Sequence, residues 1–158
     1  MPMLRLADYL QEDRVLWELP SLDKPSFLKA LAAEAAARIP AVDEEELLAR
    51  LLEREEERST GVGGGLALPH ARVSGLERTV LLVGRVRDGL DFGAPDGRPV
   101  DLLFVLLSPA DARSEHLRLL ARVARIFAPE GILEKLRAAP GPKQLFQLLL
   151  EEDARHVY

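Results

Sequence analysis

Residues 59–72 read STGVGGGLALPHAR, and helical patterns give way to strand patterns at this stretch. Four of the eleven glycines lie in its first seven residues, which predicts a loop or tight turn. The apolar run Leu66–Ala71 follows and predicts a short strand. Pro69 fixes its own φ and restricts the residue before it, so a stiff backbone holds His70. The stretch therefore predicts a turn and a strand that present a histidine.

Two amphipathic helices are predicted before this stretch. The first begins after Asp23, a candidate N-cap, and ends before Pro40. The second begins after Asp43, carries a stripe of leucines and continues to about Arg58. A short strand is expected at residues 14–19. The chain before the glycine-rich turn is thus mainly helical.

Two further strands and three helices are predicted after the histidine. The strands are Thr79–Val86 and Val100–Leu107, separated by a turn-rich segment. One helix begins after Asp111 with an apolar stripe that includes Leu117. Two shorter helices are predicted at the end of the chain, at residues 130–137 and 141–150.

Length and element order favour one domain over residues 1–158, because 158 residues is close to the commonest domain size. Helices are predicted before and after a block of strands. The segments that join these strands are too short to connect many parallel strands. We therefore expect an α/β protein of the α+β type, with a mixed β-sheet flanked by helices on both faces.

The composition narrows the classes of function. Lys plus Arg number 21 against 26 Asp plus Glu, and no basic run suggests nucleic-acid binding. No apolar stretch is long enough to span a bilayer and no signal pattern begins the chain, so we expect a cytoplasmic protein without membrane insertion. Cysteine is absent, which excludes disulfides, thiolate metal sites and a Cys nucleophile.

The glycine-rich turn has features of an anion site. Glycines allow positive φ, and their N–H groups could form a concave nest beside His70. A P-loop would need a lysine after the glycines, and a dinucleotide fingerprint would need a strand before them; neither is present. The three histidines lack the spacing of a metal site, and no metal or cofactor is expected. From composition alone, a purely structural Pro-His turn is the alternative.

Two more side chains could serve His70. His116 faces the apolar side of its predicted helix near the helix start, where the helix dipole favours a phosphoryl oxygen. A core histidine with one hydrogen-bond partner is the alternative. Arg54 lies just before the glycine turn and could bind phosphate through its guanidinium, or form only a surface ion pair. Arg58 and Arg72 are rivals for the same role.

Two sequence patterns support a family resemblance. The first pattern comprises Arg54-Glu55, Ser59-Thr60-Gly61, Gly63-Gly64-Gly65 and Leu66-Ala67-Leu68-Pro69-His70. The second, HLRLLARVARIF, begins at His116. These patterns and their spacing resemble enzyme IIA components of the bacterial phosphoenolpyruvate-dependent phosphotransferase system. The resemblance is to the fructose/mannitol class, which includes the nitrogen-regulatory proteins, and it covers nearly the whole chain.

The resemblance implies a phosphocarrier that acts together with partner proteins. His70 would accept a phosphoryl group from the carrier protein HPr through Nε2, His116 would hold that group or orient His70, and Arg54 would neutralise its charge. The candidate phosphate-binding residues in the turn are Ser59, Thr60, Gly61, Gly63 and Gly65.

The acceptor and the docking surface stay open at this point. The phosphate could pass to a IIB protein for sugar uptake, or it could switch the binding of regulatory targets. A non-catalytic interaction domain with the same fold is the main alternative, and a metal hydrolase a distant one. An apolar patch around His70 with an acidic rim would suit a basic partner.

Overall fold

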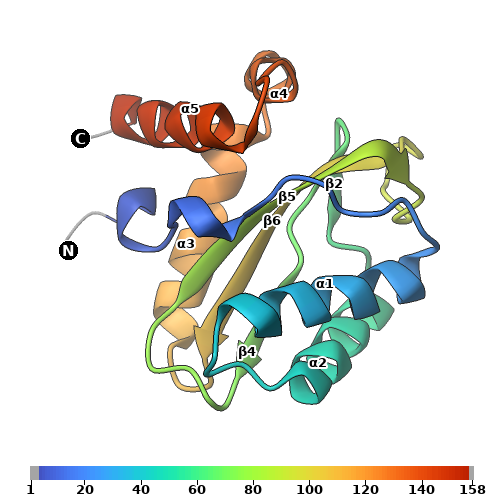
Figure 1. Ribbon diagram of the computed structural model, residues 1–158, viewed down its shortest axis with the longest axis vertical. Coiled ribbons are helices and arrows are strands. Elements are labelled where there is room, and N and C mark those ends of the chain that lie inside the picture. The colour runs from blue at the N-terminus through green and yellow to red at the C-terminus, as the bar shows by residue number, and fades with distance from the viewer. Residues whose placement is uncertain (1–3, 157–158) are drawn as a thin grey trace.

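Figure 1 shows the computed structural model, in which helices cover both faces of a β-sheet. The structure describes residues 4–156. The helical elements are two short 3₁₀ helices, η1 (Leu6–Asp8) and η2 (Glu12–Arg14), and five α-helices, α1 (Lys24–Arg38), α2 (Glu44–Glu57), α3 (Arg113–Phe127), α4 (Glu130–Arg137) and α5 (Pro142–Arg155). The strands are β1 (Val15–Leu16), β2 (Gly61–Gly63), β3 (Leu66–Ala67), β4 (His70–Val73), β5 (Val80–Leu90) and β6 (Val100–Pro109).

The sheet is mixed, as predicted. Its strand order is β1-β5-β6-β3-β2, and β4 also pairs with β6. The long strands β5 and β6 are antiparallel, whereas β1 runs parallel to β5, and both β3 and β4 run parallel to β6. The predicted mixed sheet with helices on both faces is therefore confirmed.

The strand that presents His70 is interrupted rather than continuous. Leu66 pairs with Leu102 and His70 pairs with Leu106, so the register is the same on both sides of the break. The break falls at Pro69, which has no N–H for the ladder, although its carbonyl still accepts a hydrogen bond from the Leu106 amide at 3.0 Å. The single strand predicted from sequence is thus two strands, β3 and β4, with β4 beginning at the histidine.

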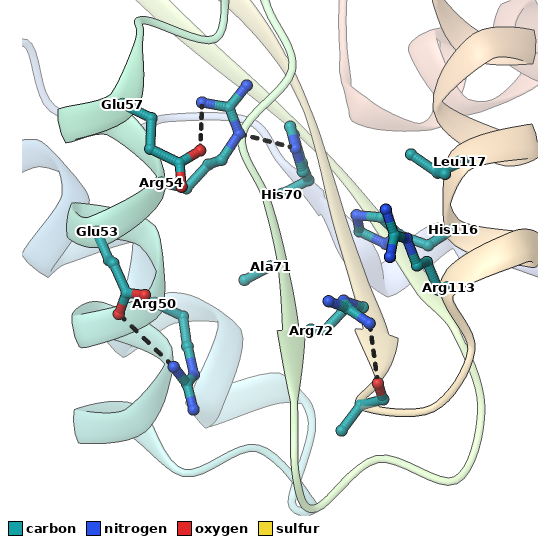
Figure 2. A pocket seen from close by; sticks show the side chains of 11 residues that line it. Arg50, Glu53, Arg54, Glu57, His70, Ala71, Arg72, Arg113, His116 and Leu117 are labelled. Atoms are coloured by element: carbon teal, nitrogen blue, oxygen red, sulfur yellow. Dashed lines mark hydrogen bonds and ion pairs between the residues drawn. The ribbon is translucent and has the colours of Figure 1, made fainter.

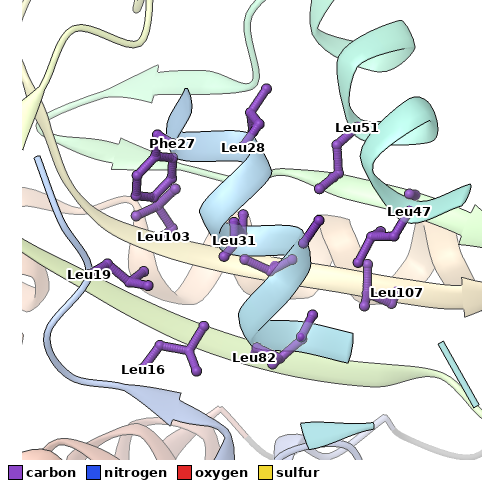
Figure 3. Close-up of a cluster of buried hydrophobic side chains, with 14 of the residues drawn as sticks. Leu16, Leu19, Phe27, Leu28, Leu31, Leu47, Leu51, Leu82, Leu103 and Leu107 are labelled. Atoms are coloured by element: carbon purple, nitrogen blue, oxygen red, sulfur yellow. The ribbon is translucent and has the colours of Figure 1, made fainter. Parts of the chain in front are cut away.

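Two apolar cores lie on opposite faces of the sheet. Strand β6 contributes to both, because its side chains point alternately to the two faces. Leu103, Val105 and Leu107 of β6 pack under α1 and α2. Figure 3 shows Leu103 and Leu107 among the buried leucines of this core. The intervening residues pack against α3, α4, α5 and the N-terminal segment; they are Leu102, Phe104 and Leu106. Every β6 side chain from Leu102 to Leu107 is at most 1 % exposed. This burial makes β6 a rigid support for β4 and for the start of α3.

Both N-caps predicted from sequence are present. The Asp23 carboxylate accepts a hydrogen bond from the Ser26 amide at 3.0 Å, and Asp43 accepts one from the Glu46 amide at 2.8 Å. Helix α2 ends at Glu57, close to the predicted end. No helix within residues 4–156 is long and apolar enough to cross a bilayer.

Three further details of the sequence prediction are wrong. The glycine-rich segment is not only a loop, because Gly61–Gly63 forms β2 and pairs with β3 in a hairpin. The strand expected at residues 14–19 shortens to the two residues of β1. Leu117 is 55 % exposed, since the buried stripe of α3 passes through its neighbour His116 instead.

Candidate active site

His70 begins β4 with its ring fixed by its own backbone. Its Nδ1 lies 2.8 Å from the carbonyl oxygen of Leu68. Because a carbonyl can only accept, Nδ1 carries the ring proton and the neutral ring keeps its lone pair on Nε2. The proline between the two residues holds this geometry. His70 is therefore a nucleophile whose reactive atom is Nε2.

Arg54 is the arginine that reaches the histidine. Its Nε donates to His70 Nε2 at 3.1 Å (Figure 2). Its Nη1 donates to the carbonyl of Arg58 at 2.9 Å. Arg58 thus contributes a carbonyl that anchors Arg54, while the Arg72 guanidinium donates to the carbonyl of Ala110 at 3.1 Å. Of the three candidates from sequence, the structure brings Arg54 into contact with the nucleophile.

Glu55, the neighbour of Arg54, holds the turn that follows α2. Its carboxylate accepts from the amide of Thr60 at 2.9 Å and from the hydroxyl of the same residue. Lys24 pairs with it at 2.8 Å. The two adjacent side chains therefore have separate tasks: one contacts His70 and the other fixes the path of the chain into β2.

His116 lies in the first turn of α3, next to His70 and almost fully buried at 5 % exposure. The two ring centroids are 5.3 Å apart. Its Nδ1 lies 2.7 Å from the hydroxyl of Ser108, a residue near the end of β6 that is 0 % exposed. Its Nε2 points away from Ser108, and the residue lines the same cavity as His70.

Both histidines are held in the neutral form. Burial lowers the pKa of His70 below its ordinary value, and the positive charge of Arg54 adds to this, against the opposing effect of the Leu68 carbonyl. Burial also lowers the pKa of His116, together with His70 and Arg72, to about 4. A neutral imidazole is the form that can attack phosphorus, so the site is ready to react at neutral pH.

A cavity of about 620 Å³ opens onto both histidines (Figure 2). Its charged lining consists of four arginines and two glutamates, namely Arg50, Arg54, Arg72, Arg113, Glu53 and Glu57. The exposed Leu117 lies on the same rim. The rim of this cavity is therefore not acidic, because the arginines of α2, β4 and α3 outnumber the acidic residues. Such a rim attracts a doubly charged phosphoryl group.

A second cavity, of about 790 Å³, also reaches His70 and Arg54, and Ser59, Thr60 and Gly61 contribute to its lining. The hydroxyls of Ser59 and Thr60 and the amides of Thr60 and Gly61 already have hydrogen-bond partners within the fold. The Ser59 hydroxyl donates to the carbonyl of Phe92 at 2.7 Å and accepts from the Gly61 amide at 3.0 Å. Thr60 is held by the carboxylate described above. The structure thus brings these three residues to the cavity at the histidine, with both hydroxyls and two of the amides engaged elsewhere.

Gly63 and Gly65 lie at the far end of the β2–β3 hairpin. Both have positive φ, +97° and +86°, which the tight turn requires. The amide of Gly64 between them donates to Asp96 at 2.9 Å, and Arg137 reaches the Gly64 carbonyl. Neither Gly63 nor Gly65 lines the two cavities at His70. Their role in binding phosphate stays a prediction.

Sequence reasoning did not single out Ser108. One signal was available, because Ser108 is the single hydroxyl residue in the otherwise apolar end of β6, before Pro109. Within residues 4–156, no group of three or more His, Asp or Glu side chains is placed to hold a metal ion.

Comparisons with known proteins agree on one family. The family model described as "Phosphoenolpyruvate-dependent sugar phosphotransferase system, EIIA 2" matches residues 8–152. A nitrogen regulatory protein of Pseudomonas aeruginosa is 38% identical over 149 residues, covering 94% of this chain and 97% of the relative. A fructose-specific EIIA component of Haloferax volcanii is 38% identical over 143 residues, covering 85% and 90%.

Solved structures give the same result at the level of the fold. The nitrogen regulatory protein IIA-Ntr of Neisseria meningitidis superposes with a TM-score of 0.83 at 28% identity, covering 91% of this chain and 98% of that one. The mannitol IIA of Escherichia coli has a TM-score of 0.72 at 17% identity, covering 88% and 97%, and supports the fold alone. The chain belongs to the EIIA 2 family of the phosphoenolpyruvate-dependent sugar phosphotransferase system.

Proposed function

We propose that this chain is a phosphocarrier that takes a phosphoryl group from phosphorylated HPr onto Nε2 of His70. The observation that carries the proposal is the 2.8 Å contact between His70 Nδ1 and the Leu68 carbonyl, which leaves a lone pair on Nε2. Arg54 supplies positive charge at the same atom, 3.1 Å away. Phosphoryl transfer requires mainly positioning and charge stabilisation, and these groups provide both.

The transfer needs no proton movement on this chain. The Nε2 lone pair forms the new P–N bond as the bond between phosphorus and the donor histidine breaks, and the donor nitrogen keeps that electron pair. The His70 ring proton stays on Nδ1, bonded to the Leu68 carbonyl. Arg54 must turn its Nε–H from Nε2 toward a phosphoryl oxygen, while its contact with the Arg58 carbonyl limits how far it moves.

His116 would donate from Nε2 to a phosphoryl oxygen on His70. It is the nearest neutral ring to the nucleophile, with 5.3 Å between the centroids. Its buried side is fixed to β6, so little reorganisation is needed when the phosphoryl group arrives. We therefore assign His70, Arg54 and His116 the roles of nucleophile, cation and hydrogen-bond donor.

The phosphoryl group would then pass to a IIB-type protein, or its presence on His70 would regulate binding to other proteins. Relatives at the same 38% identity bear both kinds of name, a nitrogen regulatory protein and a fructose-specific EIIA component. A IIA is also seen with a phosphorylated IIB in a mannitol complex from Escherichia coli. The proposed reaction would take place in the cytoplasm, with phosphoenolpyruvate as the first donor.

Intact-mass spectrometry after incubation with phosphoenolpyruvate, enzyme I and HPr tests the proposal. We expect one acid-labile phosphate on the wild-type chain and none on His70→Ala. His156→Ala is the matched control and should be phosphorylated normally, since His156 follows α5 and lines neither cavity. An unmodified wild-type chain beside phosphorylated HPr, or full phosphorylation of His70→Ala, would contradict it.

A further inference from the structure

A buried row of hydroxyls extends from His116 to the edge of the fold. His116 Nδ1 lies 2.7 Å from Ser108 Oγ, and Ser108 Oγ lies 3.4 Å from Thr79 Oγ1. The Thr79 hydroxyl is 2.6 Å from the carboxylate of Glu115, which lies 3.3 Å from the hydroxyl of Tyr9. Ser108 and Thr79 are 0 % and 5 % exposed, so water does not compete for these contacts.

The direction of each hydrogen bond follows from chemistry and distance. A carboxylate only accepts, so the Thr79 hydroxyl donates to Glu115. The Ser108 proton then has two possible acceptors, the Thr79 oxygen at 3.4 Å and the His116 nitrogen at 2.7 Å. A hydroxyl hydrogen bond is strongest near about 2.7 Å and weakens with distance, so the proton goes to the nitrogen rather than to the more distant oxygen.

We infer that Ser108 donates to Nδ1 of His116 and thereby keeps the His116 ring proton on Nε2, the atom that meets the phosphoryl group. Ser108 is thus a positioning residue: it sets which edge of a neighbouring ring is the donor. The part of this inference that concerns phosphoryl transfer rests on the proposed function. The part that concerns the tautomer rests only on the contacts above.

Thr79 and Glu115 attach the first turn of α3, which carries His116, to the rest of the fold. Glu115 precedes His116 on α3, and its carboxylate is fixed by Thr79, the residue before β5, and by Tyr9 from the N-terminal segment. Burial and the nearby Glu115 raise the pKa of Tyr9 to about 12, so its hydroxyl keeps its proton and donates. The first turn of α3 is thereby attached to two other segments, which limits rotation of the His116 ring relative to Ser108.

Long-range ¹H–¹⁵N NMR of the imidazole nitrogens in the full chain tests the inference, and His70 serves as the internal control. In the wild type we expect the unprotonated nitrogen to be Nδ1 in His116 and Nε2 in His70. In Ser108→Ala, His116 should become a mixture of tautomers while His70 stays unchanged. Ser108→Thr, which keeps a hydroxyl, should restore the wild-type pattern. A wild-type His116 with its proton on Nδ1 overturns the inference even if no variant folds.

The kinetic test uses the same variants with phosphorylated HPr as the donor. We expect phosphate uptake by Ser108→Ala to fall roughly fivefold, the factor that corresponds to one neutral hydrogen bond, and to recover in Ser108→Thr. An unchanged tautomer in Ser108→Ala overturns the inference. Failure of the proposed function gives a different result from failure of this inference. In that case the wild type would take up no phosphate, although its NMR spectrum would still show the expected tautomers.

Discussion

His70 and His116 are the same residue type in one site, yet their rings are held in opposite ways. The protonated Nδ1 of His70 bonds to a backbone carbonyl, which leaves a lone pair on Nε2. Nδ1 of His116 accepts from a side-chain hydroxyl, which leaves a proton on Nε2. One ring therefore presents a nucleophile to the cavity and the other a donor. The comparison shows that the partner of the buried nitrogen, not the histidine itself, determines the chemistry.

The hydrogen-bond partners of His70 and His116 also differ in whether a substitution can remove them. The partner of His70 is the Leu68 carbonyl, which any residue at that position would supply as long as Pro69 holds the strand break. The partner of His116 is the hydroxyl of Ser108, which a single substitution removes. We therefore expect the nucleophile to be robust to changes around it and the donor to be sensitive to them.

Removing the donor ring should have the largest effect on the transfer rate among changes that leave the nucleophile in place. His116→Ala should slow phosphate uptake roughly 10²- to 10³-fold, as for loss of a preorganised donor. His116→Gln should retain more of the rate, because a side-chain amide N–H can replace the Nε2 proton. Rapid-quench measurement of phosphohistidine formation checks both variants. Equal rates for His116→Ala and wild type would make His116 a core residue only.

Removing the positive charge should have the next largest effect. Arg54→Gln should slow uptake roughly 10- to 100-fold, since a hydrogen bond to a charged group is lost. It should also raise the pKa of His70 toward its ordinary value, because one of the groups that lower it is gone. An NMR titration of His70 measures the pKa shift. Arg72→Gln is the matched control, and equal losses in both variants would contradict a specific role for Arg54.

The smallest expected effect is on stability in mild acid. The folded pKa of His116 is about 4, below its ordinary value of 6.5, so the unfolded chain binds more protons between these values. Stability from this group is complete above pH 6.5 and falls as the pH approaches 4, by about 2 kcal/mol at pH 5. Urea unfolding at pH 7 and pH 5 measures it. His116→Gln should lose less stability over this interval, and an equal loss would contradict the low pKa.

Much of the fold follows from local sequence patterns. The caps at Asp23 and Asp43 and the apolar periodicity placed the helices, because these signals act within one turn of chain. The interruption of the strand at Pro69 and the pairing of β2 with β3 were missed. The β2–β3 hairpin is local, but two of the three residues of β2 are glycines, which are depleted in strands. The interruption at Pro69 depends on β6, which is distant in sequence and supplies the hydrogen bonds that set the register of β3 and β4. The spacing of residues along the chain does not reveal such long-range strand pairing.

The sequence predicted which residues form the site better than it predicted their hydrogen bonds. His70, His116 and Arg54 were identified from motif patterns, and the structure brings all three together. The glycines were expected to bind phosphate with free amides, yet the Gly61 and Gly64 amides donate to Ser59 and Asp96. The role of Ser108 depends on a contact between β6 and α3 that only the folded chain creates. Hydrogen-bond direction in a buried network requires distances, which the sequence does not contain.

The position of the phosphate on the ring tests the central claim most directly. The chain, labelled with ¹⁵N and phosphorylated by phosphoenolpyruvate, enzyme I and HPr, would be studied by NMR of the imidazole nitrogens and their coupling to ³¹P. We predict that the phosphorus is bonded to Nε2 of His70, that the His70 Nδ1 proton remains in place, and that His116 carries no phosphate. Phosphate on Nδ1 of His70, or on either nitrogen of His116, would contradict the assignment of nucleophile and donor.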